Sequence, residues 1–255
     1  MALLAVAVFA SCTKEDPYQP GNPSGKYSVC FDGNPDKVVL GLTDTQFEVT
    51  VSNPNGDAVT VPLTSWCSKP GLVNVPESVT FASGETEKNI VVALGEMEPF
   101  EEYLIKITIP EEYTQAYKKD GGDAEFGATF YQEDYKPFAT GTVYDEFWYE
   151  DMVTQDGETP AKIVLEYSEL LDQYRLANWL DYGADYVFSW DKDKDEIAGN
   201  KQATGIVHSS YGMIYAEVVS ENSGFDPEEN ALYFSFEWTV SAGSFGEYYN
   251  VFYFD

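Results

Sequence analysis

Apolar and polar residues alternate along short stretches of the chain from residue 26 onward, and turn-forming residues separate these stretches. In residues 46–52, the side chains of Phe47, Val49 and Val51 fall on one face and polar side chains fall on the other. Residues 101–109 repeat the pattern. Successive side chains of a β-strand point to opposite faces of its sheet. This period of two therefore predicts strands with one buried and one solvated face.

The first half of the chain is predicted to form one β-sandwich over residues 26–132. The pair Asn55-Gly56, a strong hairpin signal, separates two of its strands. The expected strands are residues 27–31, 37–42, 46–52, 59–66, 73–81, 87–94, 101–109 and 125–132.

A second domain is predicted over residues 137–255, after a boundary at residues 133–137. Of the 40 aromatic residues, 25 lie beyond Lys136, so its core should be rich in rings. Residues 168–174 could form one helical turn or a hairpin loop. The expected fold class is all-β, with two tandem β-domains: a sandwich, then an aromatic-rich β-sandwich or partly open barrel. The expected strands of this half are residues 138–144, 161–167, 185–190, 202–208, 213–220, 231–240 and 248–254.

Two motifs in the first domain are those of a known family. Residues 80–88 read TF-x-x-GET-x-K, and residues 101–109 read E-x-Y-x-x-x-I-x-I. This order resembles a Calx-β or related Ig-like repeat, which implies an Ig-like sandwich and a spacer or adhesion role. The acidic ligand set of the calcium-binding members is not reproduced here, so no calcium site is carried over.

The second domain resembles the C-terminal domains of uncharacterised surface lipoproteins from glycan-foraging gut bacteria. The likeness rests on Gly-Thr-Val-Tyr at residues 141–144, on Tyr-Arg-Leu-x-Asn at residues 174–178, and on residues 187–191. It implies a location and a β-rich fold, and no particular activity.

The first twelve residues, MALLAVAVFASC, are apolar or small up to the cysteine and carry no charge. Such a segment is typical of an export signal and is too short to span a bilayer. It resembles a bacterial lipoprotein signal with its lipobox. That resemblance implies lipid attachment at Cys12 and an outer-membrane location, at the cell surface or on the periplasmic face. A buried N-terminal strand or helix is the alternative for residues 1–12.

Residues 13–25 contain three prolines and two glycines and are predicted to form an extended tether. Their opening, Thr13-Lys14-Glu15-Asp16, is similar to the signal that sends some lipoproteins of glycan-foraging gut bacteria to the cell surface. A plain charged linker explains the same residues equally well.

The charge of the chain restricts its partners. It carries 44 acidic and 14 basic residues, a formal net charge of −30. Nucleic acids and anionic membrane surfaces both require clusters of Lys and Arg. We therefore exclude nucleic acid as a partner and expect membrane contact only through the lipid anchor.

Cysteines and acids provide few candidates for chemistry. Cys30 and Cys67 lie in expected strands, where they could be buried thiols or a disulfide. Asp191, Asp193 and Asp195 alternate as in a calcium loop, but the Gly and the closing Glu of an EF-hand are missing. A solvated hairpin tip is favoured there, and we predict no metal site and no cofactor.

The residues required for most catalytic machinery are absent. His208 is the only histidine, and it lies at the end of an expected strand, where a structural or surface role is favoured. No nucleophile elbow, P-loop or HExxH motif is present. We predict that the protein is not an enzyme. A glycoside hydrolase, which needs only two carboxylates, is the third-ranked function.

Aromatic residues divide into two groups. Those that alternate along a strand are predicted to be core: Tyr186, Phe188 and Trp190, and Phe234, Phe236 and Trp238. Those in irregular acidic segments are candidates for stacking on sugar rings: Phe147, Trp148, Tyr149, Trp179 and Tyr182. A second small core under a long loop is the alternative for this group.

Arg175 is the only arginine of the chain. A single guanidinium among many carboxylates predicts a bidentate, structural ion pair, with binding of a ligand anion as the alternative.

These patterns together predict a lipid-anchored, non-catalytic binding protein of the cell surface, with an extracellular glycan as the ligand. A structural or adhesion scaffold that contacts other surface proteins is the alternative. Exposed, coplanar rings at Trp148, Trp179 or Tyr182 would favour sugar binding, and their full burial would favour a scaffold.

Overall fold

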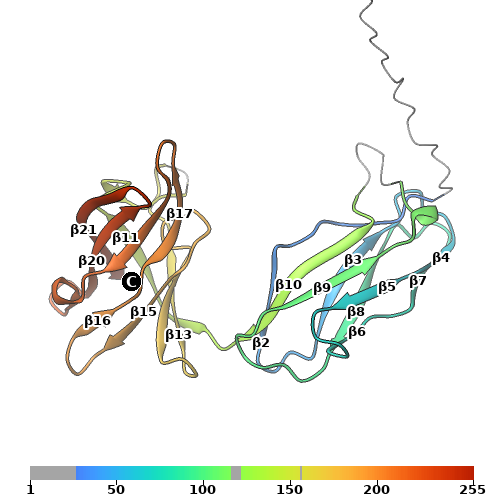
Figure 1. The fold of residues 1–255 in the computed structure, drawn as a ribbon, viewed down its shortest axis with the longest axis horizontal. Coiled ribbons are helices and arrows are strands. Elements are labelled where there is room, and N and C mark those ends of the chain that lie inside the picture. Colours follow the sequence, from blue (N-terminus) through green and yellow to red (C-terminus); the bar gives the residue numbers. More distant parts are fainter. Residues whose placement is uncertain (1–26, 116–121, 156) are drawn as a thin grey trace, which may run out of the picture. The chain divides into compact units, whose positions relative to one another are not determined.

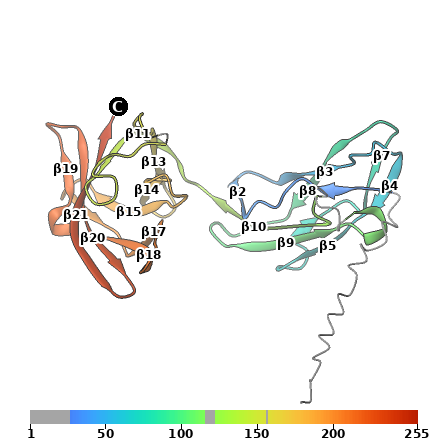
Figure 2. The same cartoon turned by 90° about the horizontal axis from the view of Figure 1, so that it is seen from above.

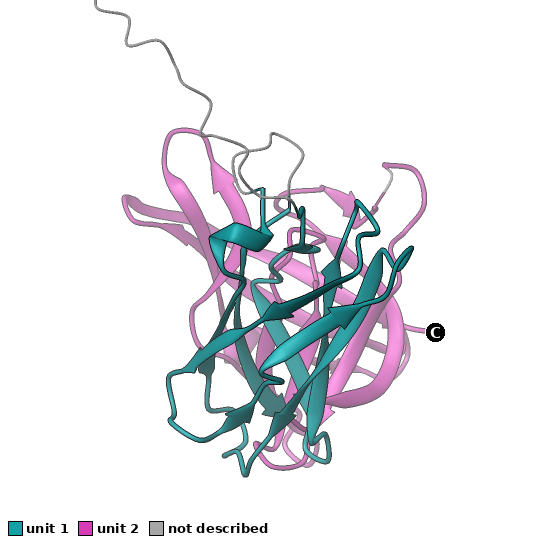
Figure 3. Cartoon of the chain, turned by 90° about the vertical axis from the view of Figure 1, so that its right-hand side faces the viewer, with its two compact units in different colours: residues 1–132 teal, residues 133–255 magenta. Residues whose placement is uncertain are grey.

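Strands make up almost all the regular structure of the computed structural model, which describes residues 27–115, 122–155 and 157–255. The prediction of an all-β chain is confirmed. Short 3-10 helices occur at η1 (Glu111–Tyr113) and η2 (Ser220–Asn222). The chain divides into two compact units, residues 1–132 and 133–255, which Figure 3 colours teal and magenta. Cys12 and the predicted tether lie outside the described residues.

Unit 1 contains two four-stranded sheets and one two-stranded sheet (Figure 1). One sheet has the order β1-β3-β8-β6, the other has the order β2-β10-β9-β5, and β4 pairs with β7. The strands are β1 (Cys30–Phe31), β2 (Lys37–Gly41), β3 (Gln46–Ser52), β4 (Val59–Pro62), β5 (Thr64–Cys67), β6 (Val73–Asn74), β7 (Ser78–Phe81), β8 (Glu87–Leu94), β9 (Tyr103–Thr108) and β10 (Glu125–Glu133).

The core of unit 1 lies between its two sheets, which Figure 2 shows as separate layers. Phe47, Val49 and Val51 of β3 are buried, as their alternation predicts. The ring of Phe47 lies 5.8 Å from that of Phe130 on β10, across the two layers. Tyr103 of β9 contacts the same ring at 5.7 Å. Unit 1 is therefore a β-sandwich.

The stretch predicted as one strand over residues 59–66 forms two strands in different sheets. β4 pairs with β7, whereas β5 pairs with β9. The break falls at Pro62 and Leu63, where Leu63 is the last buried residue of the alternation and Thr64 to Trp66 are all exposed. Proline lacks the backbone donor that would continue a ladder. The chain therefore changes partner at this point.

Unit 2 is built around one 11-stranded sheet with the main order β16-β15-β14-β13-β11-β21-β20-β18-β17. β12 also pairs with β11, and β19 with β20. The strands are β11 (Lys136–Asp145), β12 (Asp151–Met152), β13 (Ile163–Ser168), β14 (Gln173–Ala177), β15 (Tyr186–Asp191), β16 (Glu196–Ala198), β17 (Gln202–His208), β18 (Gly212–Val218), β19 (Gly224–Asp226), β20 (Ala231–Val240) and β21 (Gly243–Phe254).

This sheet curls into a partly open barrel. β16 and β17 lie at opposite ends of the strand order, yet residues 199–201 alone connect them. The two ends of the sheet must therefore approach each other, and Figure 2 shows the strands of unit 2 arranged around a common centre.

The interior of unit 2 is filled by the two aromatic stripes that the sequence predicts as core. Tyr186 and Phe188 of β15 face Phe236 and Phe234 of β20, with ring centroids 4.7 and 4.9 Å apart. Trp238 is also fully buried, and Trp190 is half-buried. The core assignment of these stripes is confirmed.

Two further questions left open by the sequence are answered by the structure. Residues 168–174 form a hairpin, because Ser168 of β13 pairs with Gln173 of β14. Cys30 and Cys67 are free thiols on strands of different sheets. Within the described ranges, no helix is both long and apolar enough to cross a membrane.

Candidate functional site

The loop that carries Trp148 is anchored by a buried carboxylate at the end of β11. Asp145 Oδ1 accepts hydrogen bonds from the backbone N–H groups of Trp148 (2.5 Å) and Tyr149 (2.7 Å). Its Oδ2 accepts one from Asn250 Nδ2 at 2.8 Å. Burial raises the pKa of Asp145 above its ordinary value, although these donors oppose the shift. The loop is therefore held by hydrogen bonds to a carboxylate that is itself fully buried.

A second loop, between β14 and β15, is anchored by Trp179. Its indole is fully buried, with centroids 5.0 Å from the ring of Phe236 and 5.9 Å from that of Trp238. The prediction that Trp179 binds ligand is therefore wrong, because it has no exposed face. The residue that follows it, Leu180, is buried too, and Tyr182 emerges only after the chain turns at Asp181, whose φ is +59°.

Trp148 and Tyr182 meet at the surface where these loops adjoin. Trp148 is 37% exposed and Tyr182 is 44% exposed. Trp148 Nε1 donates to the Tyr182 hydroxyl at 3.0 Å, and the two rings meet edge to face at 86°. Tyr149 is half-buried, and its hydroxyl donates to the carbonyl of Leu180 at 3.0 Å, which ties the loops together. The exposed rings are perpendicular rather than coplanar, so one flat ligand can stack on only one of them.

Further rings extend this surface, and two of them, Tyr211 and Phe245, were not selected from the sequence. Phe147 lies 6.5 Å from Trp148 and 5.3 Å from Phe245, and Phe245 lies 6.2 Å from Tyr211. Tyr211 is 49% exposed and lies 4.8 Å from the ring of His208. We call this set the aromatic row: Tyr182, Trp148, Phe147, Phe245, Tyr211 and His208.

The aromatic row is assembled from four loops or strand ends that are distant in sequence. They follow β11, β14, β17 and β20. The only sequence signal for the aromatic row is that each of these segments carries aromatic residues next to turn-forming residues. His208 contributes to the turn itself, because its Nδ1 accepts the backbone N–H of Ser210 at 3.1 Å. The row is a partly exposed aromatic surface on unit 2.

Arg175 forms ion pairs with two glutamates of the protein, as a structural role predicts. Its Nη1 and Nη2 donate to the two carboxylate oxygens of Glu133 at 2.9 and 2.7 Å, and its Nε donates to Glu166 at 2.7 Å. The guanidinium also lies 4.0 Å from the ring centroid of Tyr135. Burial favours the uncharged form, but the carboxylates outweigh it and raise the pKa of Arg175 above its ordinary value. The guanidinium group of Arg175 is therefore already bonded to Glu133 and Glu166.

In the acidic hairpin between β15 and β16, the carboxylates of Asp191 and Asp195 bond to other groups of the protein. Asp191 accepts the backbone N–H groups of Asp193 and Lys194 and pairs with Lys194 Nζ at 2.6 Å. Asp195 accepts the N–H of Phe225 at 2.8 Å. Among the described residues, no three acidic, histidine or cysteine side chains are placed to hold a metal ion.

Comparisons with known proteins give only distant likenesses. No family model matches the chain, and no curated protein matches it. A solved multidomain protein of Bacteroides ovatus that includes DUF1735 shares 9% identity over 88% of this chain and 92% of its own, with a TM-score of 0.32. A candidate carbohydrate-binding protein of the same species shares 9% identity over 88% and 79%, with a TM-score of 0.30.

The Calx CBD1 domain matches 42% of this chain and 98% of its own length, at 14% identity and a TM-score of 0.29. Superpositions of this quality carry no argument about function.

Proposed function

We propose that this protein is a non-catalytic glycan-binding protein, held at the outer membrane by a lipid on Cys12. The aromatic row is the observation that supports the binding role. The exposed rings of Trp148 and Tyr182 stand on loops fixed by Asp145 and Trp179, so little conformational freedom is lost when a ligand binds them. Aromatic faces stack on the apolar faces of sugar rings, and the nearby hydroxyl of Tyr182 can exchange hydrogen bonds with sugar hydroxyls.

The ligand is a neutral glycan. With a net charge of −30, the chain repels polyanions, and the acidic polysaccharides are therefore disfavoured. The single arginine, which would suit a carboxylated sugar, is engaged by Glu133 and Glu166.

The hydrogen bonds of the carboxylates in one surface cleft of unit 2 support a binding role without hydrolysis. This cleft is lined by three acids, Asp195, Asp226 and Glu221. Asp195 accepts the N–H of Phe225 and so ties the β15–β16 hairpin to β19, and Asp226 accepts the N–H of Glu228 at 2.7 Å within a turn. Two of the three carboxylates therefore have a structural task rather than that of a general acid or base.

Binding of the full chain to a panel of neutral polysaccharides tests the proposal. Trp148→Ala should weaken binding by about fivefold, because stacking on one aromatic ring contributes on the order of 1 kcal/mol. Trp66→Ala is the matched control, since Trp66 is a 56% exposed tryptophan of unit 1 and should leave affinity unchanged. Absence of binding to every polysaccharide, or equal effects of the two variants, would contradict the proposal.

The anchor has its own test. Cys12→Ser should move the protein from the membrane fraction to the soluble fraction of cells that process lipoproteins, because the thiol is the acylation site. Retention of the variant in washed membranes would refute lipid attachment at Cys12.

A further inference from the structure

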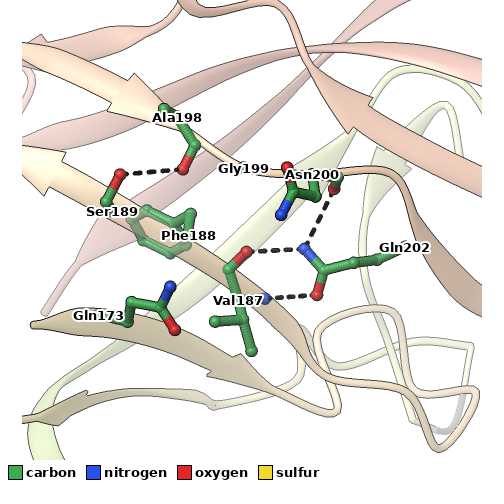
Figure 4. Close-up of a pocket in the computed structure, with 8 residues that line it drawn as sticks. All are labelled: Gln173, Val187, Phe188, Ser189, Ala198, Gly199, Asn200 and Gln202. Carbon is green, nitrogen blue, oxygen red and sulfur yellow. Dashed lines mark hydrogen bonds between the residues drawn. The ribbon is translucent and has the colours of Figure 1, made fainter. Parts of the chain in front are cut away.

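The barrel of unit 2 has a seam between β15 and β17 where strand pairing stops. β16 pairs with β15 only along Ser189, Trp190 and Asp191, so Val187 lies beyond the paired part. The side chain of Gln202, at the start of β17, takes the place of a neighbouring strand there. Its Nε2 donates to the Val187 carbonyl at 2.7 Å, and its Oε1 accepts the Val187 N–H at 3.0 Å (Figure 4).

The seam is held open by further buried bonds. The hydroxyl of Tyr186 accepts the N–H of Val218 at 3.2 Å and donates to the carbonyl of Asn200 at 3.3 Å. A Cβ at Gly199 would lie only 2.8 Å from the Tyr186 hydroxyl, so only glycine allows the backbone to pass there. The Tyr186 hydrogen bonds and the close passage of the Gly199 backbone thus fix the geometry of the seam.

A cleft of about 350 Å³ opens at this seam. That volume is at the small end of the range for ligand pockets, which is about 300 to 1,000 Å³. Val187 and Phe188 form part of its surface, and Figure 4 shows Gln173 of β14 and Asn200 flanking β15 from opposite sides.

Two polar side chains of the cleft are available to a ligand. Gln202 is fully engaged, and Ser189 Oγ donates to the Ala198 carbonyl at 3.3 Å. The side-chain amides of Gln173 and Asn200 make no hydrogen bond to any described residue. Each amide offers two donors and two acceptor lone pairs, which match the mixed donor and acceptor character of hydroxyl groups.

The residues that line the cleft carry no charge, and this indicates which class of ligand it can bind. Although the chain contains 44 acids, none of the residues that line this cleft is acidic, and none is Lys or Arg. A metal cation would require carboxylates, and an anion would require basic side chains. The cleft therefore suits a small, neutral, polyhydroxylated molecule.

We infer that this cleft binds one neutral sugar residue, whose hydroxyl groups are hydrogen-bonded by Gln173 and Asn200 while its apolar face lies on Val187. The site is separate from the aromatic row and is carried by a different observation, so it stands whether or not the row binds glycan.

Titration of the full chain with single sugars, followed by NMR of the side-chain amide groups, tests this inference. The neutral probes are glucose, galactose, mannose, xylose and N-acetylglucosamine, and the charged probes are glucuronate and glucosamine. At least one neutral probe should shift the amide resonances of Asn200 and Gln173. Asn200→Ala should weaken its binding by about tenfold, the effect of losing a hydrogen-bond pair. The variant should unfold at the wild-type temperature, because the Asn200 side chain holds no other residue.

Two control variants test the role of the Asn200 amide. Asn200→Asp keeps the shape but removes the amide donor, so it should weaken binding as Asn200→Ala does, whereas Trp66→Ala, which changes an exposed ring of unit 1, should leave single-sugar affinity unchanged. The inference is overturned if no neutral probe shifts either resonance, if both Asn200 variants bind like wild type, or if glucuronate binds more tightly than every neutral probe. Loss of polysaccharide binding in Trp148→Ala with no single-sugar site would overturn this inference and leave the proposed function standing.

Discussion

Replacement of Arg175 probes the most concentrated electrostatic cluster of unit 2. The side chain of Arg175 is 13% exposed, and those of its partners Glu133 and Glu166 are 11% and 18% exposed. Arg175→Met removes the guanidinium and leaves two carboxylates that water barely reaches. Arg175→Lys keeps one positive charge but cannot donate to both oxygens of Glu133 and to Glu166 at once.

The expected losses follow from burial. Removing one partner of a buried ion pair costs about 3 to 5 kcal/mol, because the remaining charge stays desolvated and unpaired. Arg175→Met should therefore lose about 3 to 5 kcal/mol, a large part of the roughly 5 to 15 kcal/mol that stabilises a typical domain. Arg175→Lys should lose about 1 to 3 kcal/mol, the contribution of charge-assisted hydrogen bonds that a point charge cannot replace.

Urea unfolding followed by tryptophan fluorescence measures these losses for unit 2, which holds the buried Trp179 and Trp238. The double variant Arg175→Met/Glu133→Gln should recover part of the loss, since it removes one of the two unpaired charges. If Arg175→Met costs less than about 1 kcal/mol, the value of an exposed pair, the argument from burial is refuted. If Arg175→Lys unfolds like wild type but no longer binds a ligand, the structural role itself is wrong.

Asp134 and Gly205 give two further predictions. Asp134 accepts hydrogen bonds from the Ser168 hydroxyl (2.5 Å) and the Leu170 N–H (3.0 Å), and although burial alone would raise its pKa, these bonds lower it below its ordinary value. The folded state then binds this proton more weakly than the unfolded chain. The stability contributed by Asp134 is therefore full above about pH 4 and is lost as pH falls through the folded-state pKa. Urea denaturation at a series of pH values should show that Asp134→Asn has a lower free energy of unfolding than wild type at neutral pH. The difference between the two proteins should shrink as the pH falls, and a difference that does not depend on pH contradicts this prediction. Gly205→Ala should cost at least about 1 to 2 kcal/mol, because Gly205 has a φ of +80° and a Cβ would lie 2.3 Å from the Tyr182 carbonyl. Gly183→Ala, also at positive φ but with open space around it, is the control that should show the backbone cost alone.

The strands were predictable wherever alternation ran long enough to define a buried face. Residues 46–52 were predicted as a strand and form β3 with the same bounds. Short strands such as β16 and β19 were not, because three residues carry too little periodicity to distinguish a strand from a turn. The division of residues 59–66 between two sheets could not be predicted, because it depends on which distant strand each half pairs with.

The candidate site was predictable only in part. Trp148 and Tyr182 were selected from the sequence and are exposed at adjoining loops, whereas Trp179, three residues before Tyr182, points into the core. In an irregular loop no fixed period relates neighbouring side chains, so burial cannot be assigned residue by residue. Tyr211 and Phe245 were missed because the pairing of strands that are distant in sequence brings these rings together, so that they connect through Phe147 to Trp148.

The sequence by itself determined the all-β class, the aromatic core stripes and the acidic character of the chain. Each depends on the side chains and their local order, which act through the two-residue period of a strand and through summed charge. The tertiary structure alone decided which rings are exposed, which carboxylates Arg175 engages, and that the sheet of unit 2 leaves a neutral cleft at its seam. These are properties of residues far apart in the chain, and they arise only when strand pairing and the curl of the sheet bring those residues together.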